Sequence, residues 1–225
     1  MARGFFITGT DTDVGKTTAA LGLMVALKNA GLTVAAMKPV SAGCVQTKHG
    51  LRNDDALRLM QHASIELPYE LVNPFAFEKP IAPHIAAAEQ NVEMDIDTIT
   101  QAYLEIAEQV DVVCVEGAGG WLVPFNATQT MADIASELAL DVIQVVGIKL
   151  GCISHALLTQ QSILQQNQNF VGWVSNHIQP DTLHVEKIED SLRSRLQAPL
   201  LGSMHYVRHR DPAQHASLFN IDMFL

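Results

Sequence analysis

Six apolar runs of strand length recur along the chain, and segments with helical spacing lie between them. A short run that is apolar throughout is typical of a strand buried on both faces of a parallel sheet. Because strands and helices alternate, the pattern predicts a mostly parallel sheet that right-handed crossovers cover with helices on both faces. The segment 41–53 is expected to be a loop, and prolines and aromatic residues indicate irregular structure over 68–83. We expect one strand to begin at Phe5 and the others at 32–37, 112–115, 142–148, 170–175 and 199–202.

Apolar residues at helical spacing predict the positions of the helices. After the first strand, Ala20, Met24 and Leu27 share one face of a helix that Gly31 would end. Two later helices carry recognisable capping residues at their starts. The expected helices lie at 54–61, 81–90, after the cap Asp95, after the capping box of Thr130 and Asp133, at 153–164, and at 181–195.

The first strand leads into a polar loop that ends in Gly15, Lys16 and Thr17, and a helix follows. The first N–H groups of a helix lack internal partners and lie at its positive end, so this order predicts a phosphate-binding site. Lys16 would contact the β- and γ-phosphates, and Thr17 a Mg²⁺ ion. Five residues separate Gly9 from Gly15, where the usual phosphate loop has four. A strand-to-helix turn with a solvated lysine is the alternative interpretation.

Distinctive polar residues end three of the other predicted strands. Lys38 follows the second strand, Glu116 the third and Asn176 the fifth. The carboxyl ends of parallel strands meet at one edge of a sheet, and ligands bind there. The sequence therefore predicts that these side chains lie near the phosphate loop, where Lys38 would act electrostatically. A solvated lysine before a turn is the alternative for Lys38.

Glu116 follows four apolar residues, and a carboxylate in such a position is costly unless a cation or metal pairs with it. Together with Thr17 it is a candidate ligand for Mg²⁺, which prefers oxygen. A glutamate that only caps the glycine-rich turn after the strand is the alternative. Asp55 is the candidate for a second acidic ligand, although Asp54 could instead be the ligand or a helix cap.

Length and charge limit the classes of function. The 225 residues suffice for one α/β domain, and no linker or repeat divides 1–225. A formal net charge of −10 argues against nucleic acid and anionic membranes as partners. Cys44, Cys114 and Cys152 show no disulfide or zinc spacing, which indicates reduced thiols and a cytoplasmic protein. No signal-peptide pattern or run of transmembrane length is visible in the sequence.

Five motifs taken together resemble those of the dethiobiotin synthetase family. The likeness spans about 4–202 and implies a three-layer, doubly wound α/β fold of the P-loop NTPase type that forms a homodimer. The motifs are Gly-Thr-Asp-Thr-Asp-Val-Gly-Lys-Thr at 9–17, Lys-Pro-Val at 38–40, Gly-Leu-Arg-Asn-Asp-Asp at 50–55, Val-Glu-Gly-Ala-Gly-Gly at 115–120, and Val-Gly-Ile-Lys-Leu-Gly-Cys-Ile at 146–153.

The resemblance implies an ATP- and Mg²⁺-dependent ligase of biotin biosynthesis whose substrates are 7,8-diaminopelargonic acid and CO₂. One amine of the diamine would become a carbamate, and the γ-phosphate of ATP would activate it as a carbamic-phosphoric anhydride. The second amine would then close the ring, with release of ADP and phosphate. Because the substrate supplies its own nucleophiles, the protein's task is positioning and charge neutralisation.

The resemblance also implies roles for individual residues. Lys38 and Lys16 would be catalytic, and Thr17, Asp55 and Glu116 would form the metal site. The nucleotide would contact Asp13, Val14, Gly15, Lys16, Thr17, Thr18, Asp55, Glu116, Gly117, Ala118, Gly119, Asn176, His177, His205, Tyr206 and Val207. The substrate would contact Thr12, Lys38 and Ser41, and its tail carboxylate would meet the turn Leu150, Gly151, Cys152, Ile153 and Ser154 of the neighbouring subunit.

Three positions depart from the family's pattern. The family often has a hydroxyl residue at the position of Ala42, where this chain has Ser41 one place earlier. Ser154 stands where asparagine is common, and His205 where proline is frequent.

Three other classes of protein are alternatives to this family. A partitioning-type ATPase of the same fold usually carries a second lysine near the start of its phosphate loop, where this chain has Thr-Asp-Thr at 10–12. A GTPase should show Asn-Lys-x-Asp after a late strand, where this chain has Asn-His-Ile-Gln at 176–179. A non-catalytic nucleotide-binding dimer would need neither Lys38 nor the turn at 150–154.

Overall fold

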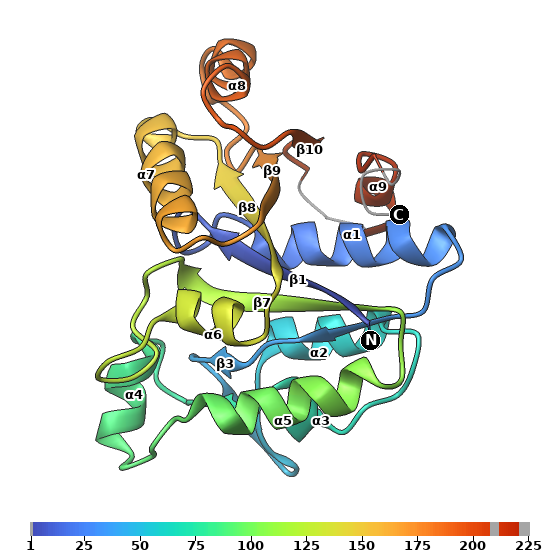
Figure 1. Cartoon of the computed structure of the whole chain (residues 1–225), viewed down its shortest axis with the longest axis vertical. Coiled ribbons are helices and arrows are strands. Elements are labelled where there is room, and N and C mark those ends of the chain that lie inside the picture. Colours follow the sequence, from blue (N-terminus) through green and yellow to red (C-terminus); the bar gives the residue numbers. More distant parts are fainter. Residues whose placement is uncertain (1, 208–211, 221–225) are drawn as a thin grey trace.

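A six-stranded parallel sheet lies at the centre of the protein (Figure 1). The computed structural model describes residues 2–207 and 212–220. Every pair of neighbouring strands in this sheet is parallel, as the apolar runs predicted. The strand order is β10 (Leu200–Met204), β9 (Phe170–Asn176), β8 (Asp141–Gly147), β1 (Arg3–Gly9), β7 (Val112–Gly120) and β2 (Val34–Met37).

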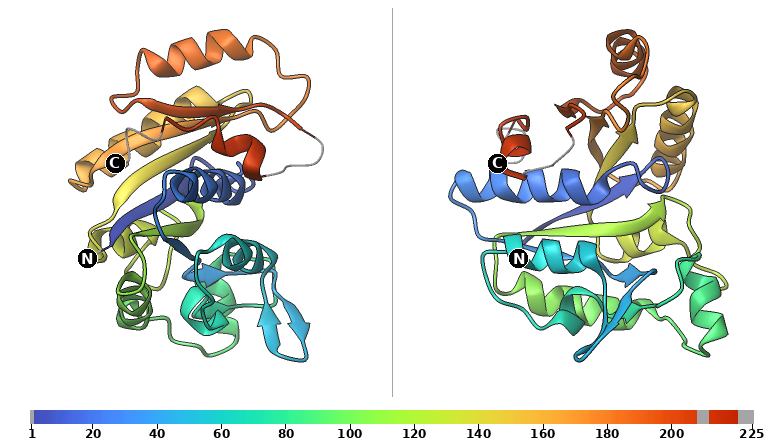
Figure 2. Two further views of the ribbon diagram at one scale, coloured as in Figure 1. Left: turned by 90° about the vertical axis from the view of Figure 1, so that its right-hand side faces the viewer. Right: turned by 180° about the vertical axis from the view of Figure 1, so that it is seen from behind.

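Helices cover both faces of the sheet, which confirms the predicted three-layer fold class (Figures 1 and 2). Along β1, Phe5 and Ile7 face one layer and Phe6 faces the other. Two of the helices have 14 residues, and within the described ranges no helix has both the length and the apolar character needed to cross a membrane. One face carries α1 (Lys16–Asn29) and α9 (Pro212–Ala216), the other α5 (Ile96–Ala107) and α6 (Met131–Glu137), while α7 (Cys152–Gln165) and α8 (Val185–Arg193) share an apolar cluster with β8 and β9.

The predicted helix caps are confirmed. The Asp95 carboxylate accepts a hydrogen bond from the Thr98 N–H at 2.6 Å at the start of α5. At the start of α6, the backbone N–H of Thr130 donates to the Asp133 carboxylate at 2.6 Å, and both halves of the capping box are present. Local side-chain chemistry therefore sets these two helix starts.

Helix α1 is buried on more sides than its single predicted apolar face. Ala20, Met24 and Leu27 do lie in the core, but the opposite side of the helix is covered as well. A Cβ atom placed on Gly22 would lie 3.0 Å from side-chain atoms of His215 and Phe219. This cover comes from the far end of the chain, and the local signal for it is the run 19–27, which is apolar on all sides of the helix.

The segment between β2 and α5 is more ordered than predicted. The predicted loop at 41–53 is wrong, because β4 (Val45–Thr47) and β5 (Gly50–Arg52) form a hairpin that projects from the body of the molecule (Figure 2). None of its strand residues is fully buried, so they produce little hydrophobic signal. The remaining elements here are β3 (Val40–Ser41), which pairs with β6 (Phe75–Ala76), and α2 (Asp54–His62), α3 (Tyr69–Val72) and α4 (Pro83–Glu89).

The largest differences from the predicted element boundaries are in β7 and α8. Strand β7 does not stop before Glu116 but continues to Gly120, because it keeps pairing with β1, where Ile7 lies opposite Glu116. Helix α8 covers Val185–Arg193 rather than 181–195, and His184 at its N-cap is left-handed, with φ of 56°. The first difference matters for the site, since it places Glu116 within a rigid central strand.

Candidate active site

The phosphate loop connects β1 to α1 with the predicted geometry. Gly15 precedes the helix in the left-handed region, with φ of 89°, a conformation that a glycine adopts without strain. The Lys16 side chain is folded back over the loop, where its Nζ donates to the Asp11 carbonyl at 3.2 Å. Burial lowers the pKa of Lys16 from 10.5 to about 8, with Glu116 opposing that shift and Lys38 adding to it.

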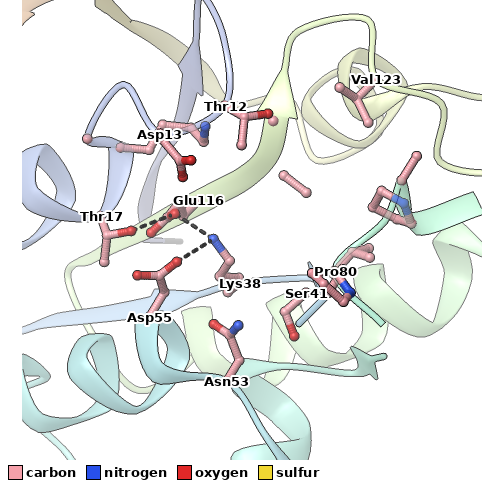
Figure 3. A pocket seen from close by; sticks show the side chains of 18 of the residues that line it. Thr12, Asp13, Thr17, Lys38, Ser41, Asn53, Asp55, Pro80, Glu116 and Val123 are labelled. Carbon is pink, nitrogen blue, oxygen red and sulfur yellow. Dashed lines mark hydrogen bonds and ion pairs between the residues drawn. The ribbon is translucent and has the colours of Figure 1, made fainter. Parts of the chain in front are cut away.

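Lys38 lies between two carboxylates at the carboxyl ends of β2 and β7 (Figure 3). Its Nζ is 2.5 Å from Oε1 of Glu116 and 3.4 Å from Oδ2 of Asp55. The Thr17 hydroxyl donates to the same Glu116 oxygen at 3.0 Å. The first turns of α1 and α2, the end of β2 and strand β7 thus bring all four predicted side chains together.

Burial decides how these charges behave. Lys38 is 6% exposed and Glu116 is 1% exposed, so neither is solvated and the alternative of a solvated Lys38 is wrong. Burial alone would lower the pKa of Lys38, but the Glu116 and Asp55 carboxylates outweigh it and raise that pKa. The ammonium ion is thereby held charged, and the alternative in which Glu116 only caps a turn is also wrong.

The two acidic residues at the start of α2 have different positions. Asp55 points to Lys38, whereas Asp54 is exposed in the first turn of the helix. The cap is Asn53, whose Oδ1 accepts from the Ala56 N–H at 3.1 Å. Of the two candidates left open by the sequence, Asp55 is therefore the one placed at the site.

These residues line one cavity of about 780 Å³. Thr12, Asp13, Gly15, Thr18, Ser41, Ala118 and Gly119 also line it, as predicted. Gly117 does not, because it packs against Phe6, where a Cβ atom would lie 2.9 Å from the ring. Of the three predicted nucleotide contacts at 117–119, only Ala118 and Gly119 therefore line the cavity.

Ser41 is at the cavity wall, but its hydroxyl is already used within the protein. It donates to Oδ1 of Asn73 at 2.7 Å and lies 3.1 Å from the Cys44 Sγ. Ser41 is 1% exposed, and the neighbouring Ala42 lines the same cavity. The Ser41 hydroxyl, which stands one place before the family's hydroxyl position, is therefore engaged in contacts within the protein.

The predicted nucleotide contacts at 176–177 and 205–207 lie outside this cavity, at the ends of β9 and β10. Asn176 is buried, and its Nδ2 donates to the Val14 carbonyl in the phosphate loop at 2.7 Å. Its Oδ1 is buried without a partner in the described part of the chain. His177 is hydrogen-bonded to Glu189 at 2.9 Å, while His205 and Tyr206 are exposed. Val207 is half-buried.

The predicted tail-carboxylate turn is also separate from the main cavity. Leu150 is fully exposed, and Gly151, at the N-cap of α7, has φ of 91°. Lys149 links this turn to the phosphate loop through an ion pair with Asp11 at 2.6 Å. Thr12 lines both the main cavity and a second hollow of about 450 Å³, which Trp121, Leu122 and Leu158 also line.

Known proteins resemble this chain over nearly its whole length. A family model described as an AAA domain matches residues 3–214. The ATP-dependent dethiobiotin synthetase of Vibrio parahaemolyticus is 44% identical over 225 residues, which are 100% of this chain and 99% of that protein. The one from Pseudomonas aeruginosa is 48% identical over 214 residues, 95% of this chain and 94% of that protein. The chain belongs to the ATP-dependent dethiobiotin synthetase family.

Solved structures confirm the P-loop NTPase fold that the family resemblance implied. MinD of Aquifex aeolicus, a cell division protein, has a TM-score of 0.54 at 16% identity, over 98% of this chain and 89% of MinD. A chain of the MinC:MinD complex of the same organism has a TM-score of 0.56 at 17% identity, over 92% and 82%. At such identities the likeness shows the fold alone.

The oxygen atoms at the cavity are suited to a Mg²⁺ ion. Glu116 Oε2 is buried without a partner in the described residues, and Thr17 and Asp55 offer further oxygens beside it. Within those residues, no group of three or more His, Cys, Asp or Glu gathers as a complete metal site. Mg²⁺ at a nucleotide site usually has one or two carboxylate ligands and completes its shell with phosphates and water, so the set fits.

Several cavity residues were missed from the sequence. Asn53, Arg58 and the segment 80–83 also line the cavity. The signal for Asn53 was present, since an asparagine directly before two acidic residues is typical of a helix cap. Arg58 is three residues after Asp55 and therefore lies on the same helix face. The segment 80–83 carries no comparable signal.

Proposed function

We propose that this protein is an ATP-dependent dethiobiotin synthetase, which joins CO₂ to 7,8-diaminopelargonic acid in biotin biosynthesis. One observation carries the proposal: the Lys16, Lys38 and Glu116 side chains from three different strand ends line one cavity. Family membership names the substrates, and the cavity offers the charges that they require. We assign the function to the whole chain, 1–225, as one domain.

The proposed reaction needs no nucleophile from the protein. One amine of the diamine attacks CO₂, giving a carbamate and a proton. A carbamate oxygen then attacks the γ-phosphorus of ATP, which forms a carbamic-phosphoric anhydride and releases ADP. The second amine attacks the carbonyl carbon, loses a proton and expels phosphate, which closes the ureido ring.

We assign Lys38 to the carbamate and to the charge on the phosphoryl group in transfer. Glu116 and Asp55 keep its ammonium ion charged although Lys38 itself is buried, and a fixed charge of this kind is what stabilises charge that develops during a reaction. Both carboxylates come from rigid elements, a central strand and the first turn of a helix. Lys38 is thus held ready before the substrates arrive.

We assign Lys16 to the nucleotide phosphates and Thr17, Asp55 and Glu116 to Mg²⁺. The free N–H groups at the start of α1 would surround the phosphates beside Asp13, Val14 and Thr18. When bound, Mg²⁺ would neutralise phosphate charge. Thr12 and Ser41 would lie at the end of the cavity where the diamine enters.

We assign the adenine to Asn176, His177 and the segment 205–207, of which Asn176 contacts the phosphate loop at Val14. The unpaired Asn176 oxygen supports this, because an adenine amino group is a donor of the right type. We assign the tail carboxylate to the turn 150–154 of a second subunit. The exposed Leu122, Leu150 and Leu158 near that turn offer apolar surface for a homodimer.

Release of ADP that depends on the diamine tests the proposal. Purified protein would be supplied with ATP, Mg²⁺, bicarbonate and the diamine, and each component would be left out in turn. We expect ADP to appear at the full rate only when all four are present, with dethiobiotin formed in equal amount by mass spectrometry. ATP turnover that is indifferent to the diamine would contradict the proposed function.

A further inference from the structure

A closed ring of polar contacts lies behind the cavity wall, and it uses two residues to which no role has been assigned. They are Asn73, which follows α3, and Tyr69, which begins α3. The ring leads from the Lys38 backbone through Asn73 and Tyr69 to the start of α2, and returns to the Lys38 ammonium through Asp55.

Asn73 makes the first half of the ring. Its Nδ2 donates to the Lys38 carbonyl at 2.6 Å, and its Oδ1 accepts from the Tyr69 hydroxyl at 2.8 Å and the Ser41 hydroxyl at 2.7 Å. An amide oxygen has two lone pairs, so both are used. Asn73 is 3% exposed, which means that water cannot replace these bonds.

Tyr69 makes the second half. Its hydroxyl oxygen accepts from the Asn53 N–H at 2.8 Å, directly before α2 begins. Asp55 lies in the first turn of that helix, and its carboxylate returns to Lys38. The Arg52 guanidinium lies over the Tyr69 ring at 4.0 Å and covers the phenol from the outside.

Such a ring fixes both ends of one ion pair. The Lys38 backbone is tied to α3, the start of α2 is tied to the same α3, and the two side chains meet in the cavity. Buried polar groups are costly unless all are satisfied, and a fully satisfied network is rigid. Loss of one member would therefore change the spacing of Lys38 and Asp55.

We propose that Asn73 and Tyr69 are positioning residues that set the separation of Lys38 and Asp55 for the reaction. The inference rests on the proposed roles of Lys38 and Asp55, since neither Asn73 nor Tyr69 lines the cavity. The Tyr69 hydroxyl is the most specific part of the ring, because this single oxygen joins the helix that carries Asp55 to the segment that carries Lys38.

Tyr69→Phe removes only this oxygen, and Tyr103→Phe is its matched control. Both tyrosines are 7% exposed, but Tyr103 lies in α5, away from the cavity lining. Two quantities would be measured for wild type and both variants: kcat with its dependence on Mg²⁺ concentration, and the Kd of ADP with and without Mg²⁺.

We expect Tyr69→Phe to lower kcat about tenfold and to raise the Mg²⁺ concentration at half-maximal activity several-fold, as when a residue that supports a metal ligand is removed. The Kd of ADP without Mg²⁺ should stay within about twofold of wild type, because the phosphate loop is untouched. Tyr103→Phe should leave all these quantities unchanged. Asn73→Asp, which keeps the acceptor but removes the donor to Lys38, should lower kcat with unchanged ADP affinity.

Wild-type kcat and wild-type Mg²⁺ response in Tyr69→Phe would overturn the inference. Equal losses in Tyr69→Phe and Tyr103→Phe would also overturn it, since they would reflect a general loosening of the core. The ADP measurement separates this inference from the proposed function. If wild type shows no diamine-dependent turnover, the proposed function fails, but a weakened Mg²⁺ effect on ADP binding in Tyr69→Phe alone would still support positioning.

Discussion

The two halves of the strand-end surface differ in how much of the site is built before a ligand binds. At β1, β7 and β2, buried charges already pair with one another, as Lys38 does with Glu116. At β8, β9 and β10, Asn176 is buried, but other predicted contacts lie on exposed turns, where Leu150 and His205 face solvent. The half assigned to phosphoryl transfer is thus prearranged, whereas the half assigned to adenine and the substrate tail is open.

The difference follows from what each half must do. Charge stabilisation is strongest when dipoles and ions are fixed in a dry site before the reaction. A site that recognises a base or a tail carboxylate can remain incomplete until the ligand binds or another subunit supplies the missing contacts. Substitutions in the first half should therefore affect kcat, and those in the second half should affect affinity and selectivity.

Lys38→Ala should have the largest effect, because it removes the charge at the centre of the prearranged half. We expect turnover to fall by roughly 100-fold or more, as on loss of a prearranged donor. The Kd of ADP should change little, since Lys16 and the start of α1 remain. Steady-state kinetics and calorimetric ADP titration measure the two quantities.

Lys48→Ala is the matched control for this variant, because Lys48 is exposed between β4 and β5, outside the cavity lining. It should behave as wild type. Near-normal turnover in Lys38→Ala would contradict the catalytic role that we assign to Lys38, and with it the proposed difference between the two halves of the site.

The pH dependence of ADP binding should report on Lys16 rather than on Lys38. The pKa of Lys16, about 8 in the free protein, means that it loses its proton as the pH rises through 8, whereas the pKa of Lys38 is raised and that lysine stays charged. Bound phosphates favour the protonated lysine, so binding above pH 8 takes up a proton. ADP affinity should be level near pH 7 and fall by up to about tenfold per pH unit above 8.

Calorimetry at about pH 8.5 in buffers of different ionisation enthalpy measures that proton uptake directly, because the lysine is then mostly unprotonated before ADP binds. Lys16→Met should bind ADP weakly and without this pH dependence. A wild-type affinity that stays level well above pH 8 would contradict the assignment of Lys16 to the phosphates.

Much of the fold and of the prearranged half could be predicted from the sequence, because its signals are local. Unbroken apolar runs identified the six sheet strands, and polar residues directly after the apolar runs identified Lys38, Glu116 and the loop before α1. Parallel strands expose their carboxyl ends at one edge, so strand order was not needed to predict that these residues meet.

What could not be predicted depends on contacts between distant segments. The apolar run 19–27 indicates a helix that is covered on all sides, but nothing in it identifies α9 as the cover, and residue 41 carries no sign that Asn73 engages the Ser41 hydroxyl. The hairpin at 45–52 was missed because exposed strands lack an apolar pattern. Asp54 and Asp55 could not be separated until the helix start was known, since one residue turns a side chain by about 100°.

Asn176→Ala tests whether the open half selects the base. The buried, unpaired Oδ1 should accept from the adenine amino group, and it should disfavour the oxo group of inosine. Loss of one such contact should reduce the preference for ATP over ITP, measured as a ratio of kcat/KM values, by roughly tenfold. Asn169→Ala, just before the other end of β9, should leave the ratio unchanged, and an unchanged ratio in Asn176→Ala would assign the adenine to another residue.

Gly151→Ala should have the smallest effect, because it tests only the shape of the turn that we assign to the substrate tail. Gly151 has φ of 91° and open space where a Cβ atom would lie, so alanine adds backbone strain without a clash. Strain of about 1 kcal/mol would shift the turn and raise the KM of the diamine by roughly fivefold, with the KM of ATP unchanged. Gly31→Ala is an equivalent change, with φ of 90° and equally open space, at the end of α1 far from the turn. If both variants raise the KM of the diamine equally, the turn has no part in binding the tail. If Gly151→Ala alone raises it, the result supports a contact between the turn and the substrate tail.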